Sequence, residues 1–196
     1  MILLGITGGI GSGKSYISRL LTKHFGIPVY DCDSQAKRLN DEDPTIRQQL
    51  IALVGPHVYD PTGHLQKEAL ANYLFADAQH AARVNAIIHP AVMTDLRNWA
   101  SQQQSRVVAV ESAILYESGF NNAVDYVLFV DAPSEIRLRR AMQRDSAQRP
   151  QIEARMAQQY TCENLSRADF VIENDGATND QQLVCQLAQI INKVNI

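Results

Sequence analysis

One segment near the N-terminus has the residue types and spacing that bind nucleotide phosphates. Glycines lack a Cβ, so their backbone can curl with its N–H groups pointing inward at an anion. A lysine at the end of such a loop is placed to contact the β- and γ-phosphates, and the next hydroxyl to ligate Mg²⁺. The segment fits the P-loop pattern G-x-x-x-x-G-K-[ST] and reads Gly8-Gly9-Ile10-Gly11-Ser12-Gly13-Lys14-Ser15.

The residues on either side are those that a P-loop needs. The apolar run from Ile2 to Ile6 predicts a buried strand. From Tyr16 to Phe25 apolar residues recur at helical spacing, and Gly26 is a C-terminal stop signal. The pattern G-x-G-x-x-G is not met, which argues against a Rossmann dinucleotide site. The sequence therefore predicts strand, phosphate loop and helix in succession.

Composition narrows the classes of protein. The chain has 196 residues, three cysteines and a formal net charge of −3. The charge gives no basic field for nucleic acid or an anionic membrane. The cysteines form no C-x-x-C pair, which favours a reducing compartment over a disulfide framework or zinc site. We expect no signal peptide and no membrane span, and hence a cytoplasmic α/β protein.

Two carboxylates follow the second predicted strand, which covers residues 27–30. In an extended chain Asp31 and Asp33 would point to the same side. Ligands of open parallel sheets bind beyond the carboxyl ends of the strands, so Asp33 could face the phosphates across a crevice. The alternative is that Asp33 or Ser34 caps a helix beginning at Gln35.

Residues 34–104 are predicted to be mostly helical, too long for an ordinary crossover and therefore an inserted subdomain. Asp43-Pro44 predicts a capped helix start, and Asp77 is placed to cap a helix that Pro90 would end at His89. Insertions of this kind hold a second substrate. His89 itself is either a substrate ligand or a helix-end histidine, and spacing alone favours the second.

The remaining strands are predicted at 106–111, 124–130 and 168–172, with Ser134 capping the helix after the fourth. Glu111 ends the third strand where a metal-side carboxylate would lie, although aspartate is usual there. Residues 137–155 are basic, and this region is either a solvated helix or a lid whose arginines bind phosphate. Arg140 and Arg144 are its candidate ligands, and an amphipathic helix closes the chain from Asn179.

Together these features resemble the nucleotide-kinase branch of the P-loop NTPase fold, and in particular the dephospho-coenzyme A kinase family. The fold implied is a three-layer α/β structure with a five-stranded parallel sheet, a helical substrate-binding insertion and a lid. The nucleotide-binding core would cover residues 1–33, 105–136 and 166–196, the acceptor subdomain 34–104 and the lid 137–165. The resemblance rests on Gly5–Ser15, Asp31-Cys32-Asp33, His89-Pro90, Leu115-Tyr116-Glu117, Arg140 with Arg144-Asp145, and Ala168–Gly176.

The resemblance implies transfer of the γ-phosphoryl group of ATP to the ribose 3′-hydroxyl of dephospho-CoA, the last step of coenzyme A synthesis. Catalysis would involve Asp33, Lys14 and Arg140. Nucleotide would be bound by Thr7, Gly8, Gly9, Gly11, Ser12, Gly13, Lys14, Ser15, Tyr16, Arg144 and Asn174, with Mg²⁺ on Ser15. The acceptor would contact Asp31, Asp33, His89, Leu115 and Glu117. Tyr16 stands where the family often has threonine.

Two other functions fit the motifs less well. One is a kinase for another small acceptor, such as a nucleoside monophosphate. The other is an ATP-dependent regulatory switch, which would want a Walker-B aspartate and a mobile loop that reads the γ-phosphate. The partners expected are ATP and dephospho-CoA, with no nucleic acid or membrane, in a monomer or weak homo-oligomer.

Overall fold

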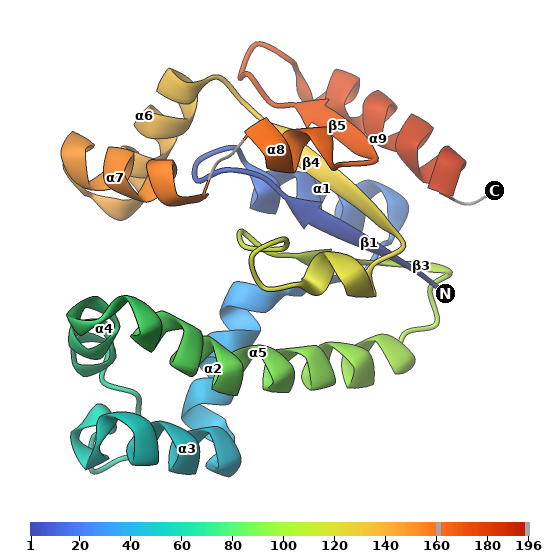
Figure 1. The fold of residues 1–196 in the computed structure, drawn as a ribbon. Coiled ribbons are helices and arrows are strands. Elements are labelled where there is room, and N and C mark those ends of the chain that lie inside the picture. Colours follow the sequence, from blue (N-terminus) through green and yellow to red (C-terminus); the bar gives the residue numbers. More distant parts are fainter. Residues whose placement is uncertain (160–161, 195–196) are drawn as a thin grey trace. The chain divides into compact units, whose positions relative to one another are not determined.

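The computed structural model describes residues 1–159 and 162–194. The chain divides into two compact units, one of residues 1–31 and 103–196 and one of residues 32–102 (Figure 1). Within the described residues, no helix is long and apolar enough to span a membrane. The first unit contains β1 (Ile2–Thr7), α1 (Lys14–Phe25), β2 (Val29–Asp31), β3 (Val107–Glu111), η2 (Phe120–Ala123), β4 (Tyr126–Asp131), α6 (Ser134–Asp145), α7 (Arg149–Gln159), α8 (Cys162–Ser166), β5 (Phe170–Glu173) and α9 (Asp180–Val194).

The first unit is built on a parallel five-stranded sheet in the order β2-β3-β1-β4-β5. Because all strands run the same way, their carboxyl ends meet at one edge, where the loops that bind ligands are found in such sheets. Thr7, Asp31, Glu111 and Asp131 end their strands at this edge, and Asn174 follows directly after β5. The predicted five-stranded parallel sheet is confirmed.

The main core lies between the sheet and the helices α1 and α9. Leu4 and Ile6 of β1 pack there with Ile17 and Leu21 of α1. α9 contributes the apolar face that its sequence spacing predicts, with Leu183, Leu187, Ile190, Ile191 and Val194 buried. The chain stops being helical after α1 because Gly26 adopts the left-handed conformation, with φ of 64°. Local signals thus place the helix that follows the P-loop.

Three strands begin two residues later than the sequence predicts. β2 starts at Val29, β4 at Tyr126 and β5 at Phe170. Apolar residues precede each of these strands, and hydrophobicity indicates burial but not where the hydrogen bonds of the sheet begin. β3 is predicted most closely, since all five of its residues are buried and form a continuous apolar run up to Glu111.

The second unit is helical and contains α2 (Cys32–Glu42), α3 (Pro44–Val54), η1 (Pro56–Val58), α4 (Lys67–Ala76) and α5 (Ala78–Ser101). Asp43 caps α3 by accepting hydrogen bonds from the N–H groups of Thr45 and Ile46, at 2.7 and 3.1 Å. Asp77 accepts one from Gln79 at the start of α5, at 2.7 Å. Both predicted caps are confirmed.

The prediction that Pro90 ends its helix is wrong. α5 continues through Pro90 to Ser101. A proline removes only one backbone donor, and this helix keeps an apolar face on both sides of it, with Val84, Val92 and Leu96 buried. Packing of that face outweighs the local preference.

Helices α6 and α7, which the sequence predicts to be a lid, pack on the P-loop. Ile10 of the loop joins a small core with Leu138 and Ala141 of α6 and with Ile152 and Met156 of α7. The predicted cap on Ser134 is wrong, because Ser134 is the first residue of α6 and Pro133 takes the capping position without a side-chain hydrogen bond. Segment 137–165 is therefore part of the first compact unit.

Candidate functional site

The P-loop connects β1 to α1 in the conformation that its glycines require. Gly11 and Gly13 have φ of 77° and 95°, in the left-handed region that side chains disfavour. A Cβ on Gly11 would collide with the carbonyl of Arg137, and one on Gly13 with the amide of Asn174. The loop is thus curled against neighbouring elements as well as on itself, and any larger residue at these positions would open it.

Lys14 is the first residue of α1, and its side chain folds back over the loop. The Nζ atom donates to the carbonyl oxygens of Gly8 and Gly9, at 3.0 and 3.2 Å. The ammonium is therefore held at the loop together with the N-terminus of α1, where the helix dipole also favours an anion. This is the placement expected of a residue that neutralises phosphate charge.

A buried carboxylate faces two serine hydroxyls of α1. Ser15 donates to Oε1 of Glu111 at 2.6 Å, and Ser18 donates to Oε2 at 2.7 Å. Glu111 is only 8% exposed although it ends β3. Its two oxygens are thus each held by a serine from the same face of α1, because residues at i and i+3 are neighbours on a helix.

This group has the donor chemistry of a magnesium site. Mg²⁺ is bound through one or two carboxylates or hydroxyls, substrate phosphates and several waters. The hydroxyl of Ser15 and the carboxylate of Glu111 supply such oxygens beside the phosphate loop. The sequence predicts Glu111 as a candidate carboxylate on the metal side but does not single out Ser18. The spacing of three residues between Ser15 and Ser18 is the feature that could have indicated it.

Arg140 of α6 lies against the P-loop. Its Nη1 donates to the carbonyl oxygens of Asn174 and Ser12, at 2.9 and 3.5 Å. The side-chain amide of Asn174 also donates to Ser12, at 2.9 Å. Arg140 and Asn174, which are 34 positions apart in the chain, were both predicted to bind nucleotide. They join α6 and the segment after β5 to the same turn of the phosphate loop.

Arg144, the other candidate phosphate ligand in α6, contacts an acidic neighbour. It donates to both oxygens of Asp145, at 2.7 and 3.1 Å, and the same carboxylate accepts from Arg155 of α7. The hydrogen bond from Arg144, helped by the one from Arg155, lowers the pKa of Asp145 to about 2. In this structure the group joins α6 to α7, and nucleotide binding by Arg144 stays a prediction.

The loop after β3 carries three of the residues singled out in the sequence. Leu115 is fully buried, so its side chain belongs to the core and only its backbone is left for a ligand. Glu117 is exposed and accepts a hydrogen bond from Asn164 of α8, at 3.2 Å. Between them, the ring of Tyr116 is covered by the guanidinium of Arg167, 4.4 Å from its centroid.

The two carboxylates after β2 lie on different elements. Asp31 is the last residue of β2 and is the register partner of Glu111 in β3. Asp33 is exposed in the first turn of α2, which begins at Cys32. The premise that both residues extend from one strand is therefore wrong, as is a helix start at Gln35. The role of Asp33 stays a prediction.

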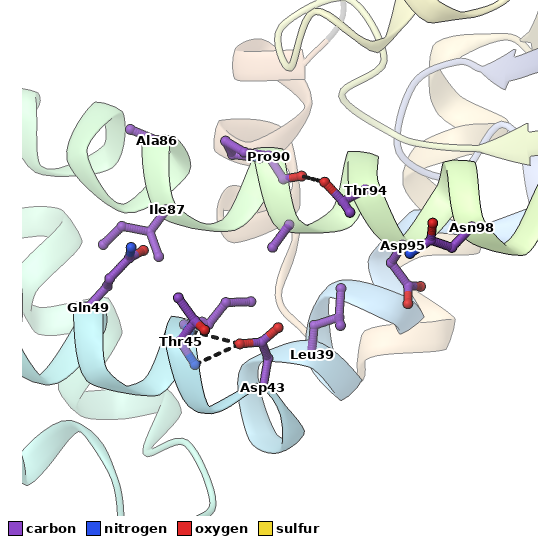
Figure 2. Close-up of a pocket in the computed structure, with 12 residues that line it drawn as sticks. Leu39, Asp43, Thr45, Gln49, Ala86, Ile87, Pro90, Thr94, Asp95 and Asn98 are labelled. Carbon is purple, nitrogen blue, oxygen red and sulfur yellow. Dashed lines mark hydrogen bonds between the residues drawn. The ribbon is translucent and has the colours of Figure 1, made fainter.

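The helical unit contains His89 and a separate groove. His89 is partly buried in α5, and burial lowers its pKa, so the ring is neutral near pH 7. Its neighbour Pro90 lines a groove of about 440 Å³ between α2, α3 and α5 (Figure 2). Leu39, Ile46 and Ile87 give this groove an apolar lining, with Asp43, Thr94, Asp95 and Asn98 among its polar residues.

A parallel sheet of this order, with a P-loop after β1 and a carboxylate from β3 at the P-loop serine, is a P-loop kinase-like fold. The family model described as dephospho-CoA kinase matches residues 2–180. The chain belongs to this family.

Individual relatives agree with the family model. Dephospho-CoA kinase of Bacteroides fragilis (strain YCH46) is 46% identical over 192 residues, covering 97% of this chain and 91% of that protein. Dephospho-CoA kinase of Porphyromonas gingivalis is 45% identical, covering 99% and 95%. A crystal structure from Thermus thermophilus superposes with a TM-score of 0.85 at 32% identity, covering 98% of this chain and 96% of that one.

Proposed function

We propose that the protein transfers the γ-phosphoryl group of ATP to the ribose 3′-hydroxyl of dephospho-CoA, giving coenzyme A and ADP. Membership of the family and the arrangement of Lys14, Ser15 and Glu111 at the P-loop support this reaction. The 3′-oxygen forms the new bond to γ-phosphorus, the bond from γ-phosphorus to the β–γ bridging oxygen breaks, and the hydroxyl proton leaves to a base. ADP departs with the bridging oxygen.

On the nucleotide side, the loop amides and Lys14 bind the phosphates. The transition state spreads negative charge over the transferred group, and fixed positive charge stabilises it without reorganisation. When bound, Mg²⁺ would supply positive charge that neutralises the phosphates. Ser15 and Glu111 would hold it, directly or through water. Arg140, already aligned against Ser12 and Asn174, adds a guanidinium from the lid.

On the acceptor side, we assign Asp33 as the group that orients the 3′-hydroxyl and takes its proton. Asp31, at the end of β2, is the supporting carboxylate, and His89 contacts the acceptor as a neutral imidazole. The groove beside Pro90 is the candidate surface for a part of the acceptor away from the reacting hydroxyl. A cytoplasmic protein that is a monomer or weak homo-oligomer remains our expectation.

An acceptor panel tests the reaction. The protein is incubated with ATP and Mg²⁺ and with dephospho-CoA, AMP, CMP or no acceptor, and ADP release is measured. We expect turnover that depends on dephospho-CoA. Turnover of a nucleoside monophosphate without turnover of dephospho-CoA would favour a different kinase, and acceptor-independent hydrolysis would favour a switch.

A further inference from the structure

A cavity of about 380 Å³ opens directly beside the P-loop in the first unit. It begins at Gly13, and its walls come from α1, the lid helix α6, the turn after β5 and the start of α9. Its lining residues are Gly13, Tyr16, Arg140, Asn174, Gly176, Thr178, Asp180 and Leu183. Since Gly13 also belongs to the phosphate loop, the cavity continues from the place where the phosphates would bind.

The wall opposite α1 is built by a turn with fixed hydrogen bonds. One oxygen of Asp175 accepts from the N–H groups of Ala177 and Thr178, at 2.9 and 2.8 Å, and from the Thr178 hydroxyl at 3.0 Å. Arg140 holds the beginning of the same turn through the carbonyl of Asn174. These hydrogen bonds hold the wall in place without a ligand.

Tyr16 forms the wall on the side of α1, and its ring is held in place from across the cavity. The phenol donates a hydrogen bond to Oδ1 of Asp180 in the first turn of α9. Asp180 is itself on a well-fixed helix start, because Asn179 and Gln182 exchange hydrogen bonds of 3.1 and 3.0 Å. The bond to Asp180 also raises the pKa of Tyr16, so the phenol stays protonated and remains a donor at neutral pH.

These walls suit a flat, partly apolar group. Leu183 is almost fully buried and gives the cavity an apolar base, while Tyr16 and Arg140 contribute an aromatic ring and a guanidinium to its lining. The guanidinium of Arg19 lies over the Tyr16 ring, 5.7 Å from its centroid, so a base would contact the part of the ring that Arg19 leaves open. Aromatic and guanidinium planes both stack on nucleobases. A nucleotide whose phosphates are at Lys14 extends its ribose and base away from the loop, and this cavity borders the loop.

We propose that Tyr16, held by its hydrogen bond to Asp180, is a specificity-determining residue that packs against the base of the nucleotide and favours a purine. A purine presents more surface to the ring than a pyrimidine. This inference rests on the proposed function only for the identity of the nucleotide donor. It assigns the Tyr16–Asp180 pair a role that the phosphate loop does not supply.

The test compares full-length variants in the dephospho-CoA assay and in direct binding of ADP by calorimetry. Tyr16→Leu keeps apolar bulk and loses the aromatic face. We expect its KM for ATP and its Kd for ADP to rise about 10-fold, within the range for one base–aromatic stack. Its kcat at saturating ATP should change little, and its preference for ATP over CTP in kcat/KM should fall.

A double-mutant cycle tests whether the hydrogen bond between Tyr16 and Asp180 holds the ring for binding. Tyr16→Phe and Asp180→Ala should each raise the KM for ATP by a smaller, similar factor, and the double variant should be no worse than either. Asp180→Asn is the matched control, because its amide oxygen still accepts from the phenol, and it should behave like the unaltered protein.

Two results would overturn the proposal. If Tyr16→Leu lowers the melting temperature but leaves the KM for ATP and the ATP to CTP preference unchanged, the pair only joins α1 to α9. Additive effects in the cycle would show that Asp180 does not act through Tyr16. Failure of the unaltered protein to phosphorylate dephospho-CoA would count against the proposed function instead, and ADP binding would still test the role of Tyr16.

Discussion

Both the charge and the position of Lys14 fit a role in binding the transferred phosphoryl group. Its ammonium is held at the carbonyls of Gly8 and Gly9, so it is preorganised for the transferred phosphoryl group. We expect Lys14→Ala to lower kcat by about 10²–10³-fold, the usual loss for one preorganised group in an active site. Circular dichroism and melting temperature should stay close to those of the unaltered protein. Normal kcat in a folded variant would contradict the assignment.

Ser18 acts on the site without being placed to touch nucleotide. Removing its hydroxyl leaves Oε2 of the buried Glu111 without its donor at 2.7 Å. Hydrogen bonds to charged groups contribute about 1.5–3 kcal/mol, so Ser18→Ala should lower the free energy of unfolding by an amount of that order. Because Glu111 is then free to turn away from Ser15, the Mg²⁺ concentration for half-maximal rate should rise several-fold. An unchanged Mg²⁺ dependence would separate Glu111 from the metal.

Asp33 and Asp31 can be distinguished by isosteric substitution. If Asp33 accepts the proton of the 3′-hydroxyl, Asp33→Asn should lower kcat by about 10²–10⁴-fold, with little change in ADP affinity. Asn is also a good residue at a helix start, so a purely structural Asp33 would tolerate the change. Asp31→Asn is the paired variant, and its kcat should fall less than that of Asp33→Asn. The reverse order of activities would show that Asp31 is the base.

At the scale of elements, Asp145 is one of the residues that join helices α6 and α7. Asp145 accepts from Arg144 and Arg155 and has a folded-state pKa of about 2, below its ordinary value of 3.8. A lowered pKa means that the ionised carboxylate stabilises the fold above about pH 4, and that this stabilisation is lost as the pH falls toward 2.

We therefore expect Asp145→Asn to lower the free energy of unfolding at pH 7 and to lose that difference near pH 2. Urea unfolding over this range measures it. Glu153→Gln, which removes an exposed pair with Arg149, is the control and should have a small effect at every pH. A difference for Asp145→Asn that persists at pH 2 would contradict the linkage.

The elements that could be predicted from sequence are those with local causes. Asp43 and Asp77 cap helices through donors two or three residues away, and Gly26 ends α1 through its own conformation. Pro90 was misleading because burial of the face around it decided the length of α5. Ser18 and Asp180 were missed because their partners, Glu111 and Tyr16, are 93 and 164 positions away in the chain.

At the scale of the whole molecule, the residues assigned to the two substrates are divided unequally between the two compact units. All the nucleotide-binding candidates, from Thr7 to Asn174, lie in the first unit. The acceptor candidates Asp33 and His89 lie in the second, while Asp31, Leu115 and Glu117 lie in the first. Each substrate should therefore protect a different set of backbone amides from hydrogen exchange.

Hydrogen exchange measured with one substrate at a time tests this expectation. ADP with Mg²⁺ should slow exchange in the P-loop, the first turns of α1 and the segment 174–183, because these line the phosphate site and its cavity. It should leave exchange in α3, α4 and most of α5 unchanged.

Dephospho-CoA alone should slow exchange in α2 and around His89 in α5. Tyr16→Leu should reduce protection of 174–183 by ADP while keeping that of the P-loop. If dephospho-CoA protected only residues of the first unit, the helical unit would not be the acceptor subdomain, and the roles given to Asp33 and His89 would be wrong.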